Sequence, residues 1–344
     1  CEEVLGVRMA CFLGLDVGGR KSHCLVGVER GNVLGFGSAG TGNYEVHGVG
    51  PALEENKKAI DAALTNAGLT LPDIAGIGMG IAGADIPEDY VMLEREMYTP
   101  LFGDIPRDFQ NDSMAGLRGG TQAPYGIVIA CGTGCVCAGK SNSGDHARAG
   151  GLGEEFGDEC TGSQIGRDGL QRVWQARDGI IPPTLLTQKF VERAATRDVE
   201  DLFLKLYRRQ LTYNDLQPMA KLVFDAAHEG DAAAAEILRV GGNYLAAMVV
   251  AVAKRLDLAH EEFDVVMAGS VFKGISPILK DSMLDAIQRD CPRARTVMPM
   301  FEPVVGALLM GMELHLEIAP QIYENLSNQL LAAETRYHTR FKAK

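Results

Sequence analysis

Two glycine-rich turns are the segments of this chain best suited to chemistry. Residues 12–28 read FLGLDVGGRKSHCLVGV, and residues 127–139 read IVIACGTGCVCAG. In both segments an apolar run resumes after the glycines, which predicts two β-hairpins with bare backbone tips. Such tips bring backbone N–H groups close to a phosphate, so the pair could hold a triphosphate. Asp16 lies just inside the first turn, where a phosphate-bound metal ion would need a carboxylate.

Asp112 is a second acidic residue in a position suited to chemistry. It ends a short predicted strand, FQND at 109–112, and precedes a predicted helix that begins SMAGLRGG. A carboxylate there could accept the proton of a hydroxyl group during phosphoryl transfer. It could equally cap the N-terminus of the helix, and the two roles are compatible.

Composition and charge exclude several classes of protein. The chain has 344 residues, 46% of them hydrophobic, and a formal net charge of −12. This length allows two domains, and the acidic balance argues against non-specific nucleic-acid binding. A phosphorylated ligand is still possible, because backbone amides bind phosphate without side-chain charge. We expect no membrane span: the longest apolar stretch, 243–253, is followed by Lys254 and Arg255 and predicts a buried core helix.

The eight cysteines do not form a disulfide framework typical of small secreted domains. None is in a C-x-x-C pair, so we expect reduced thiols in a cytoplasmic protein. Cys131, Cys135 and Cys137 flank the second glycine turn. They are either small apolar strand residues or, with Cys160, a metal or iron–sulfur site, although their spacing matches no standard ligand pattern.

The order of apolar runs predicts a two-lobed α/β protein. A glycine-rich segment, 141–163, is too long for a plain connection, so we expect a functional loop there. Strands are expected at 11–17, 23–28, 35–38, 74–82, 109–112, 126–139 (a hairpin) and 263–268, and helices at 51–67, through most of 163–256, at 276–288 and at 303–317.

These segments, in this order, resemble the actin-like ATPase and sugar-kinase superfamily. Within it, the chain is similar to the N-acetylglucosamine kinase group and its BadF/BadG-type ATPase relatives. The resemblance rests on GLDVGGRKS (14–22), QNDSMAGL (110–117), IACGTGC (129–135), GGLGEEFGDECTGSQIG (150–166), MAGSVFK (267–273) and EPVVGALLMG (302–311). Six motifs in the expected order are far more specific than any one of them.

The resemblance implies an actin-like ATPase, ribonuclease H-like fold with a helical insertion in the second lobe. The lobes it implies are 9–117 with 303–320 and 118–302, followed by a polar tail, 321–344. It further implies an ATP-dependent, magnesium-requiring kinase that phosphorylates an amino sugar, N-acetylglucosamine at the 6-hydroxyl. We expect a cytoplasmic homodimer with no nucleic-acid or membrane partner.

Other functions remain open at this point. The acceptor could be glucosamine or N-acetylmuramate, or the chain could be a non-catalytic, sugar-sensing BadF-type protein. The presence of both Asp16 and Asp112 favours catalysis. A nicotinamide-dependent dehydrogenase or a P-loop enzyme would need glycine motifs that are absent from the sequence.

The resemblance also implies roles for individual residues. Asp16 would bind Mg²⁺ through water, and Asp112 would be the catalytic base. ATP would contact Gly18, Gly19, Arg20, Lys21, Ser22, Gly132, Thr133, Gly134, Gly269 and Ser270. The acceptor sugar would contact Asn43, Asp112, Thr133, Gly151, Leu152 and Asp158. Leu152 replaces a tryptophan of the relatives, and Cys160 replaces a glycine suited to positive φ, so we expect a changed acceptor pocket.

Overall fold

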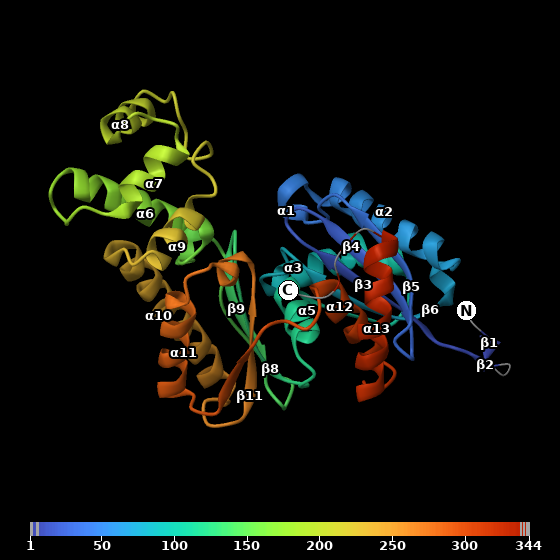
Figure 1. Ribbon diagram of the computed structural model, residues 1–344. Helices are drawn as coiled ribbons and strands as arrows, with labels where there is room; N and C mark the ends of the chain where they lie inside the picture. The colour runs from blue at the N-terminus through green and yellow to red at the C-terminus, as the bar shows by residue number, and fades with distance from the viewer. Residues whose placement is uncertain (1–2, 5–6, 338, 340, 342–344) are drawn as a thin grey trace. The chain divides into compact units, whose positions relative to one another are not determined.

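The computed structural model describes residues 3–4, 7–337, 339 and 341, and the chain divides into two compact units (Figure 1). Unit 1 comprises Cys1–Val128 with Val297–Lys344, and unit 2 comprises Ile129–Thr296. The units therefore change at 128/129 and 296/297, whereas the sequence placed the lobe boundaries at 117/118 and 302/303. Each unit is built around a five-stranded sheet with helices packed on it, which confirms the predicted α/β class.

The sheet of unit 1 brings three strand ends together. Its order is β5-β4-β3-β6-β7. The strands are β3 (Cys11–Val17), β4 (Ser22–Val28), β5 (Val33–Ala39), β6 (Ile74–Ile81) and β7 (Arg107–Asn111). β3, β4 and β5 pair antiparallel, whereas β3, β6 and β7 pair parallel. Val17 lies beside Ile81, and Ile81 beside Asn111, so the carboxyl ends of the parallel strands meet at one end of the sheet.

Helices cover both faces of this sheet because side chains alternate along its strands. Leu13 and Leu15 pack in one apolar cluster with helix α2, whereas Phe12 packs in another with α12 and α13. The remaining elements of unit 1 are β1 (Glu3–Val4), β2 (Val7–Arg8), α1 (Tyr44–His47), α2 (Val49–Ala67), η1 (Leu71–Asp73), α3 (Pro87–Leu93), η2 (Glu94–Tyr98), α4 (Thr99–Phe102), α5 (Asp112–Gly120), α12 (Pro303–Glu313) and α13 (Pro320–Tyr337). The segment expected as a polar tail thus contains α13, which buries an apolar stripe that includes Leu326 and Leu330.

Glycine allows α12 to lie directly on the sheet. A Cβ built on Gly14 would be 2.3 Å from the backbone nitrogen of Leu308, and one on Gly78 would be 2.0 Å from the carbonyl oxygen of Ala307. Any side chain at either position would push the helix away. These glycines are therefore structural, and they set how closely α12 packs on β3 and β6.

Unit 2 has the sheet order β10-β9-β8-β11-β12. Its elements are β8 (Gly126–Cys131, which begins at the end of unit 1), β9 (Cys135–Lys140), β10 (His146–Gly150), η3 (Glu154–Phe156), α6 (Gly162–Arg177), α7 (Leu185–Arg193), α8 (Val199–Tyr207), α9 (Met219–His228), α10 (Ala232–Arg255), β11 (Phe263–Ala268), η4 (Ser270–Lys273), α11 (Ile278–Asp290) and β12 (Ala294–Val297). The helical stretch after 163 and the strand at 263–268 are confirmed. Strand β12 was not predicted.

The expected loop at 141–163 is partly wrong. Its centre, β10, pairs antiparallel with β9 from His146 opposite Lys140 to Gly150 opposite Val136. The backbone of β9 offers hydrogen-bond partners there, and HARAG has too little apolar alternation to reveal the strand from sequence alone. Only the part after Gly150 remains a glycine-rich loop.

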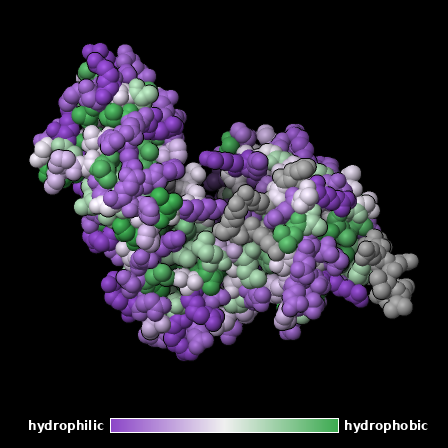
Figure 2. Space-filling view, in the orientation of Figure 1, coloured by the Kyte–Doolittle hydropathy of each residue, from purple (hydrophilic) through white to green (hydrophobic). Residues whose placement is uncertain are grey.

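Helix α10 is the core helix of unit 2. By length and composition alone its 24 residues could cross a membrane. Leu238, Leu245, Val249 and Val252 are buried, and α10 packs against α9 and α11. This confirms the buried helix predicted at 243–253. Figure 2 shows hydrophilic side chains over much of the visible face, with apolar residues scattered among them.

Candidate functional site

The first glycine hairpin is held firmly behind an open tip. The Gly18 N–H donates to the carbonyl oxygen of Lys21 at 2.9 Å, which closes the turn. The Thr41 hydroxyl donates to the carbonyl oxygen of Gly18 at 2.7 Å. The Ser22 hydroxyl is buried, donates to Asn56 Oδ1 and accepts from the Gly42 N–H. Ser22 thus supports the turn from within, whereas Gly19 and the cationic residues beside it are exposed.

Nothing in the described part of the chain requires glycine at position 19. Gly19 does not have a positive φ, and a Cβ built on it would have no atom within 4 Å. Gly134, in the second hairpin, is the same in both respects. Gly14, by contrast, is forced by close packing. A glycine that the fold does not need keeps backbone open to an external group, as a phosphate-binding tip would.

Three carboxylates lie near the strand ends of unit 1. Burial and, after it, the negative charges of Asp112 and Glu302 together raise the pKa of Asp16 to about 8. Such a site favours an added cation, so the residues present suit Mg²⁺. Among the described residues, no group of three or more His, Cys, Asp or Glu side chains could itself hold a metal. A magnesium ion here would therefore depend on water and phosphate oxygens for most of its ligands.

Glu302 was not among the predicted site residues. It is the N-cap residue of α12, and it begins EPVVGALLMG, one of the six motifs of the resemblance. An acidic residue at the start of a glycine-containing helix was the only signal available. Its proximity to Asp16 depends on how α12 packs on the sheet, which the sequence does not give.

The capping role considered for Asp112 belongs to its neighbour. Asn111 is the N-cap of α5, and its Oδ1 accepts from the Ser113 N–H at 3.1 Å. Asn111 also donates through Nδ2 to Asp85 Oδ1 at 2.8 Å. Asp112 is the first residue of the helix, so its carboxylate is not needed as the cap. This is compatible with the role of catalytic base, which stays a prediction.

Asn43 lies near the turn that follows β6. It caps α1 by accepting from the Glu45 N–H at 2.9 Å, and its Nδ2 donates to the Glu45 carboxylate at 3.3 Å. A Cβ built on Gly83 would lie 2.7 Å from Asn43 Oδ1, so the turn after β6 closes on this side chain. Unit 1 thus gathers Asn43, Asp16 and Asp112 at neighbouring strand ends.

The second glycine hairpin joins β8 to β9 through residues 132–134. Its Gly132 carbonyl accepts from the Gly162 N–H at 2.8 Å, which ties the tip to the start of α6. A Cβ on Gly132 would lie 3.3 Å from Ser270 Oγ, and Gly269, at φ +100°, packs on Cys131. The structure therefore brings the second tip close to Gly269 and Ser270, which were also predicted to contact ATP. Their contacts with a nucleotide stay a prediction.

The loop after β10 is clamped from two sides. Asp158 is buried, and its two carboxylate oxygens accept from the N–H groups of Gly151 at 2.7 Å and Gly153 at 2.9 Å. Arg148 donates to the carbonyl oxygens of Gly150 and Gly151. This holds the loop in a fixed shape and leaves Leu152, at its tip, 51% exposed. Arg148 was not predicted, because only the pairing of β10 with β9 places it beside the loop.

Cys160 confirms the expectation of an unusual backbone at its position. It has a φ of +62°, in the region that favours glycine, although its side chain is buried. Space for that side chain comes from α10: a Cβ built on Gly241 would lie 2.7 Å from the Cys160 sulfur. Cys131 Sγ donates to the Cys160 carbonyl at 3.0 Å, so the second hairpin is also linked to this residue.

The proposed metal or iron–sulfur reading of the cysteines is wrong for the part of the chain that the structure describes. The seven described cysteines are all free and buried, and none belongs to a group that could hold a metal. Burial raises the pKa of Cys137, and hydrogen bonding with Cys135 and Cys160 raises that of Cys131. The described cysteines are therefore apolar packing residues.

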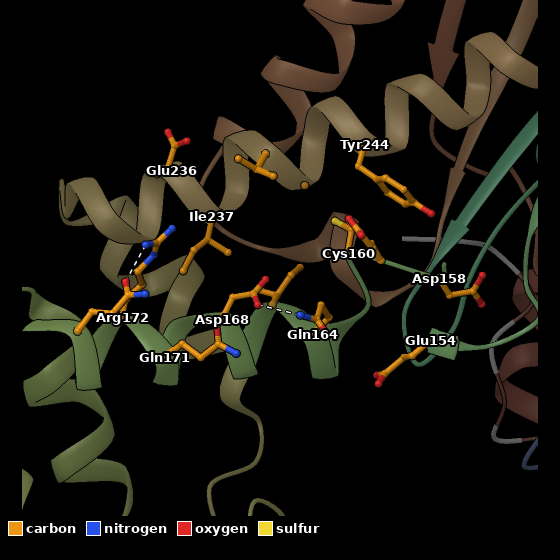
Figure 3. A pocket seen from close by; sticks show the side chains of 15 residues that line it. Glu154, Asp158, Cys160, Gln164, Asp168, Gln171, Arg172, Glu236, Ile237 and Tyr244 are labelled. Atoms are coloured by element: carbon orange, nitrogen blue, oxygen red, sulfur yellow. Dashed lines mark hydrogen bonds between the residues drawn. The ribbon is translucent and has the colours of Figure 1, made fainter. Parts of the chain in front are cut away.

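A cavity of about 470 Å³ lies between α6 and α10, beside the clamped loop (Figure 3). Gln164 and Asp168 reach it from α6, and Ile237 and Tyr244 from α10. Asp158 lines it as well, so loop and cavity share a wall. The full lining is Glu154, Asp158, Glu159, Cys160, Gln164, Ile165, Asp168, Gln171, Arg172, Gln175, Glu236, Ile237, Val240, Gly241 and Tyr244.

Comparison with solved structures supports the fold. The chain superposes on a structure from Chromobacterium violaceum with a TM-score of 0.65 and 24% identity, covering 88% of this chain and 99% of that one. A ROK family glucokinase from Streptomyces griseus, in complex with glucose and AMPPNP, matches with a TM-score of 0.52 and 17% identity, covering 88% and 100%. The two sheets with their helices thus define an actin-like ATPase fold of the sugar-kinase type.

The sequence comparisons give the family. Residues 13–311 match the BadF/BadG/BcrA/BcrD ATPase family, and this chain belongs to it. The N-acetyl-D-glucosamine kinase of Dictyostelium discoideum is 30% identical over 88% of this chain and 97% of its own length. The N-acetylmuramic acid/N-acetylglucosamine kinase of Clostridium acetobutylicum is 27% identical over 88% and 98%.

Proposed function

We propose that this protein is an ATP-dependent kinase of amino sugars, and that its acceptor is N-acetylglucosamine, phosphorylated at the 6-hydroxyl. The observation that carries the proposal is the 30% identity to a curated N-acetyl-D-glucosamine kinase along nearly the full length of both chains. Asp16, near the end of β3, and Asp112, just after β7, lie at the same end of the unit 1 sheet on either side of β6. This supports the proposal, because nucleotide-dependent enzymes of α/β type act at such ends.

The roles of the phosphate-binding residues follow from the two open tips. Gly19 and Gly134 are the tip glycines that offer backbone to phosphate, whereas Gly18 and Gly132 close the two turns with their own N–H groups. Gly269 and Ser270 contact the nucleotide in this proposal. Asp16 would hold Mg²⁺ through water, and the ion would supply charge neutralisation at the phosphates. Asp112 accepts the proton of the sugar hydroxyl. The chain thus supplies positioning and charge neutralisation more than covalent chemistry.

Within unit 1, Asn43 is the proposed acceptor contact, and within unit 2 the clamped loop has this role. Asp158 fixes the shape of the loop, since both its carboxylate oxygens accept hydrogen bonds from loop N–H groups. Gly151 and the exposed Leu152 then present backbone and apolar surface to the sugar. Leu152 and Cys160 adjust the preference among amino sugars.

The three alternative functions are separated by one assay. Relatives of this chain include a glucosamine kinase of Vibrio cholerae, 25% identical over 67% of this chain, besides the N-acetylmuramic acid/N-acetylglucosamine kinase. ATP consumption should be measured with N-acetylglucosamine, glucosamine and N-acetylmuramate, and the product located by phosphorus NMR. We expect the highest kcat/KM with N-acetylglucosamine and a 6-phosphate product. Sugar binding without ATP turnover would instead identify a sugar sensor.

We also propose a cytoplasmic homodimer that requires Mg²⁺. The seven described cysteines are reduced and buried, as is usual in a reducing compartment. Light scattering should give twice the chain mass of 36.9 kDa. Activity should disappear with EDTA and return with added Mg²⁺. A monomer by light scattering, or full turnover in EDTA, would refute the corresponding part.

A further inference from the structure

The cavity between α6 and α10 has the size and lining of a small-molecule site. Its volume of about 470 Å³ lies within the range of ligand pockets. Ile165, Ile237 and Val240 give it an apolar part, and carboxylates, glutamines and the Tyr244 hydroxyl give it polar groups. An apolar surface with surrounding hydrogen-bond partners suits a sugar ring, which has apolar C–H faces and polar edges.

This cavity adjoins the loop that we assign to the acceptor. Asp158 lines the cavity and also holds the N–H groups of Gly151 and Gly153. Tyr244, on the opposite wall, donates its hydroxyl hydrogen to the carbonyl oxygen of Gly157. The loop is therefore one wall of the cavity, so a ligand against the loop also experiences the charges of the cavity.

The charge balance of the cavity is negative. Five carboxylates line it, from Glu154, Asp158, Glu159, Asp168 and Glu236, together with one cation, Arg172. Two flanking arginines reduce the charge, because Arg167 pairs with Glu154 and Arg239 with Glu236. The five carboxylates thus exceed the three arginines, Arg172, Arg167 and Arg239, by two negative charges. Burial raises the pKa of Asp168, although Gln164 donates to it at 2.8 Å and Arg172 lies nearby.

We propose that this cavity selects acceptors by charge: it admits neutral and cationic amino sugars and disfavours those that carry a carboxylate. The inference rests on the proposed function, and it goes further because it assigns discrimination to residues outside the phosphate-binding tips. A carboxylate placed among like charges loses affinity, whereas a protonated amine gains it. N-Acetylmuramate is the anionic test acceptor, and protonated glucosamine is the cationic one.

The experiment compares ratios of kcat/KM. Asp168→Asn and Glu236→Gln each remove one charge and keep the shape of the side chain. Glu262→Gln is the matched control, because Glu262 belongs to unit 2 but lies outside the cavity lining. For each cavity variant we expect the N-acetylmuramate to N-acetylglucosamine ratio to rise roughly threefold to tenfold, as expected when one partly screened like charge is removed. The glucosamine to N-acetylglucosamine ratio should fall similarly, and added salt should reduce both effects.

Using ratios removes effects of the variants on folding, ATP binding and the chemical step. If N-acetylmuramate is too large to be a substrate of any variant, the glucosamine ratio decides. Unchanged ratios in both cavity variants would overturn the inference, as would an equal shift in the Glu262→Gln control.

Calorimetric binding of the same three sugars separates this inference from the proposed function. One outcome is that no sugar is phosphorylated, but glucosamine binds and Asp168→Asn lowers its affinity. The proposed function then fails and the charge selection stands. If N-acetylglucosamine is phosphorylated but neither variant changes any ratio or affinity, the proposed function stands and the charge selection fails.

Discussion

The two glycine hairpins have the same sequence signature but different surroundings. The first lies beside Asp16, whose charge is opposed by Asp112 and Glu302. The second is flanked by buried thiols and is tied to α6 through Gly162 and to Cys160 through Cys131. Both tips contain a glycine that the fold does not require, at Gly19 and Gly134. We infer that the open glycine in each tip binds phosphate. The carboxylates around the first hairpin suit a metal ion, whereas the contacts of the second hairpin connect it to the loop proposed to bind the acceptor.

The largest expected effect concerns Asp112, the proposed proton acceptor, which lies in the same unit as the first hairpin. Asp112→Asn removes the proton acceptor and should lower kcat by roughly 10²-fold or more, the usual scale for a lost general base. Nucleotide binding, measured by calorimetry, should change little. Asn111 would still cap α5, so Tm should also be preserved. Full activity in this variant would show that Asp112 is not the general base, and that the carboxylates near the first hairpin do not distinguish it in the way we propose.

The next prediction tests what the hairpins share. Gly19→Ala and Gly134→Ala should each raise the KM for ATP, by roughly tenfold or about 1.4 kcal/mol, because the added methyl would occupy space kept for phosphate. Tm should be unchanged in both, since neither Cβ would meet a protein atom within 4 Å. Gly14→Ala is the contrast: it should lower Tm, because its Cβ would overlap Leu308. An unchanged KM in one hairpin alone would mean that only the other binds phosphate.

A third prediction concerns the negative charge around the first hairpin. The pKa of Asp16 is about 8 in the folded protein against an ordinary 3.8, so between these values the folded state holds a proton that the unfolded state has lost. The stability of the ligand-free protein should therefore fall as pH rises from about 4 to 8. Asp16→Asn should remove this dependence and raise Tm at pH 8 but not at pH 4.

Added Mg²⁺ should raise the Tm of the wild-type protein more at pH 8 than at pH 5, because the ionised carboxylate attracts it. Thermal scans across this pH range, with Asp290→Asn as a surface control, would check both expectations. A Tm of the Asn variant that changes with pH in parallel with the wild type would contradict the assignment.

The smallest expected effect tests the link that only the second region has. Gly241→Ala places a methyl 2.7 Å from the Cys160 sulfur and should cost about 1 kcal/mol of stability. In a Cys160→Gly background the same substitution should cost less, because the opposing sulfur is gone. Cys160→Gly alone also relieves a positive φ. Chemical denaturation of the four proteins gives the coupling energy, and additive effects would show that the two residues do not interact.

Much of the fold was predictable because its strands carry strong local signals. The apolar runs that became β3, β4, β6 and β11 were placed nearly to the residue. Strand β10 was missed because its stability comes from pairing with β9 rather than from its own side chains. Helix α13 was read as a polar tail because its single buried stripe is diluted by exposed polar residues.

The amino-acid sequence by itself determined which residues are suited to the chemistry: Asp16, Asp112, the two glycine tips and the unusual backbone position at Cys160. These signals are local, because each depends on residue type at the end of a strand or in a turn. Only the tertiary structure decided that Glu302 opposes Asp16, that Arg148 and Asp158 clamp one loop, and that Gly241 makes room for Cys160. Each of these contacts joins residues from different elements of the chain, and their proximity comes from packing that no single segment encodes.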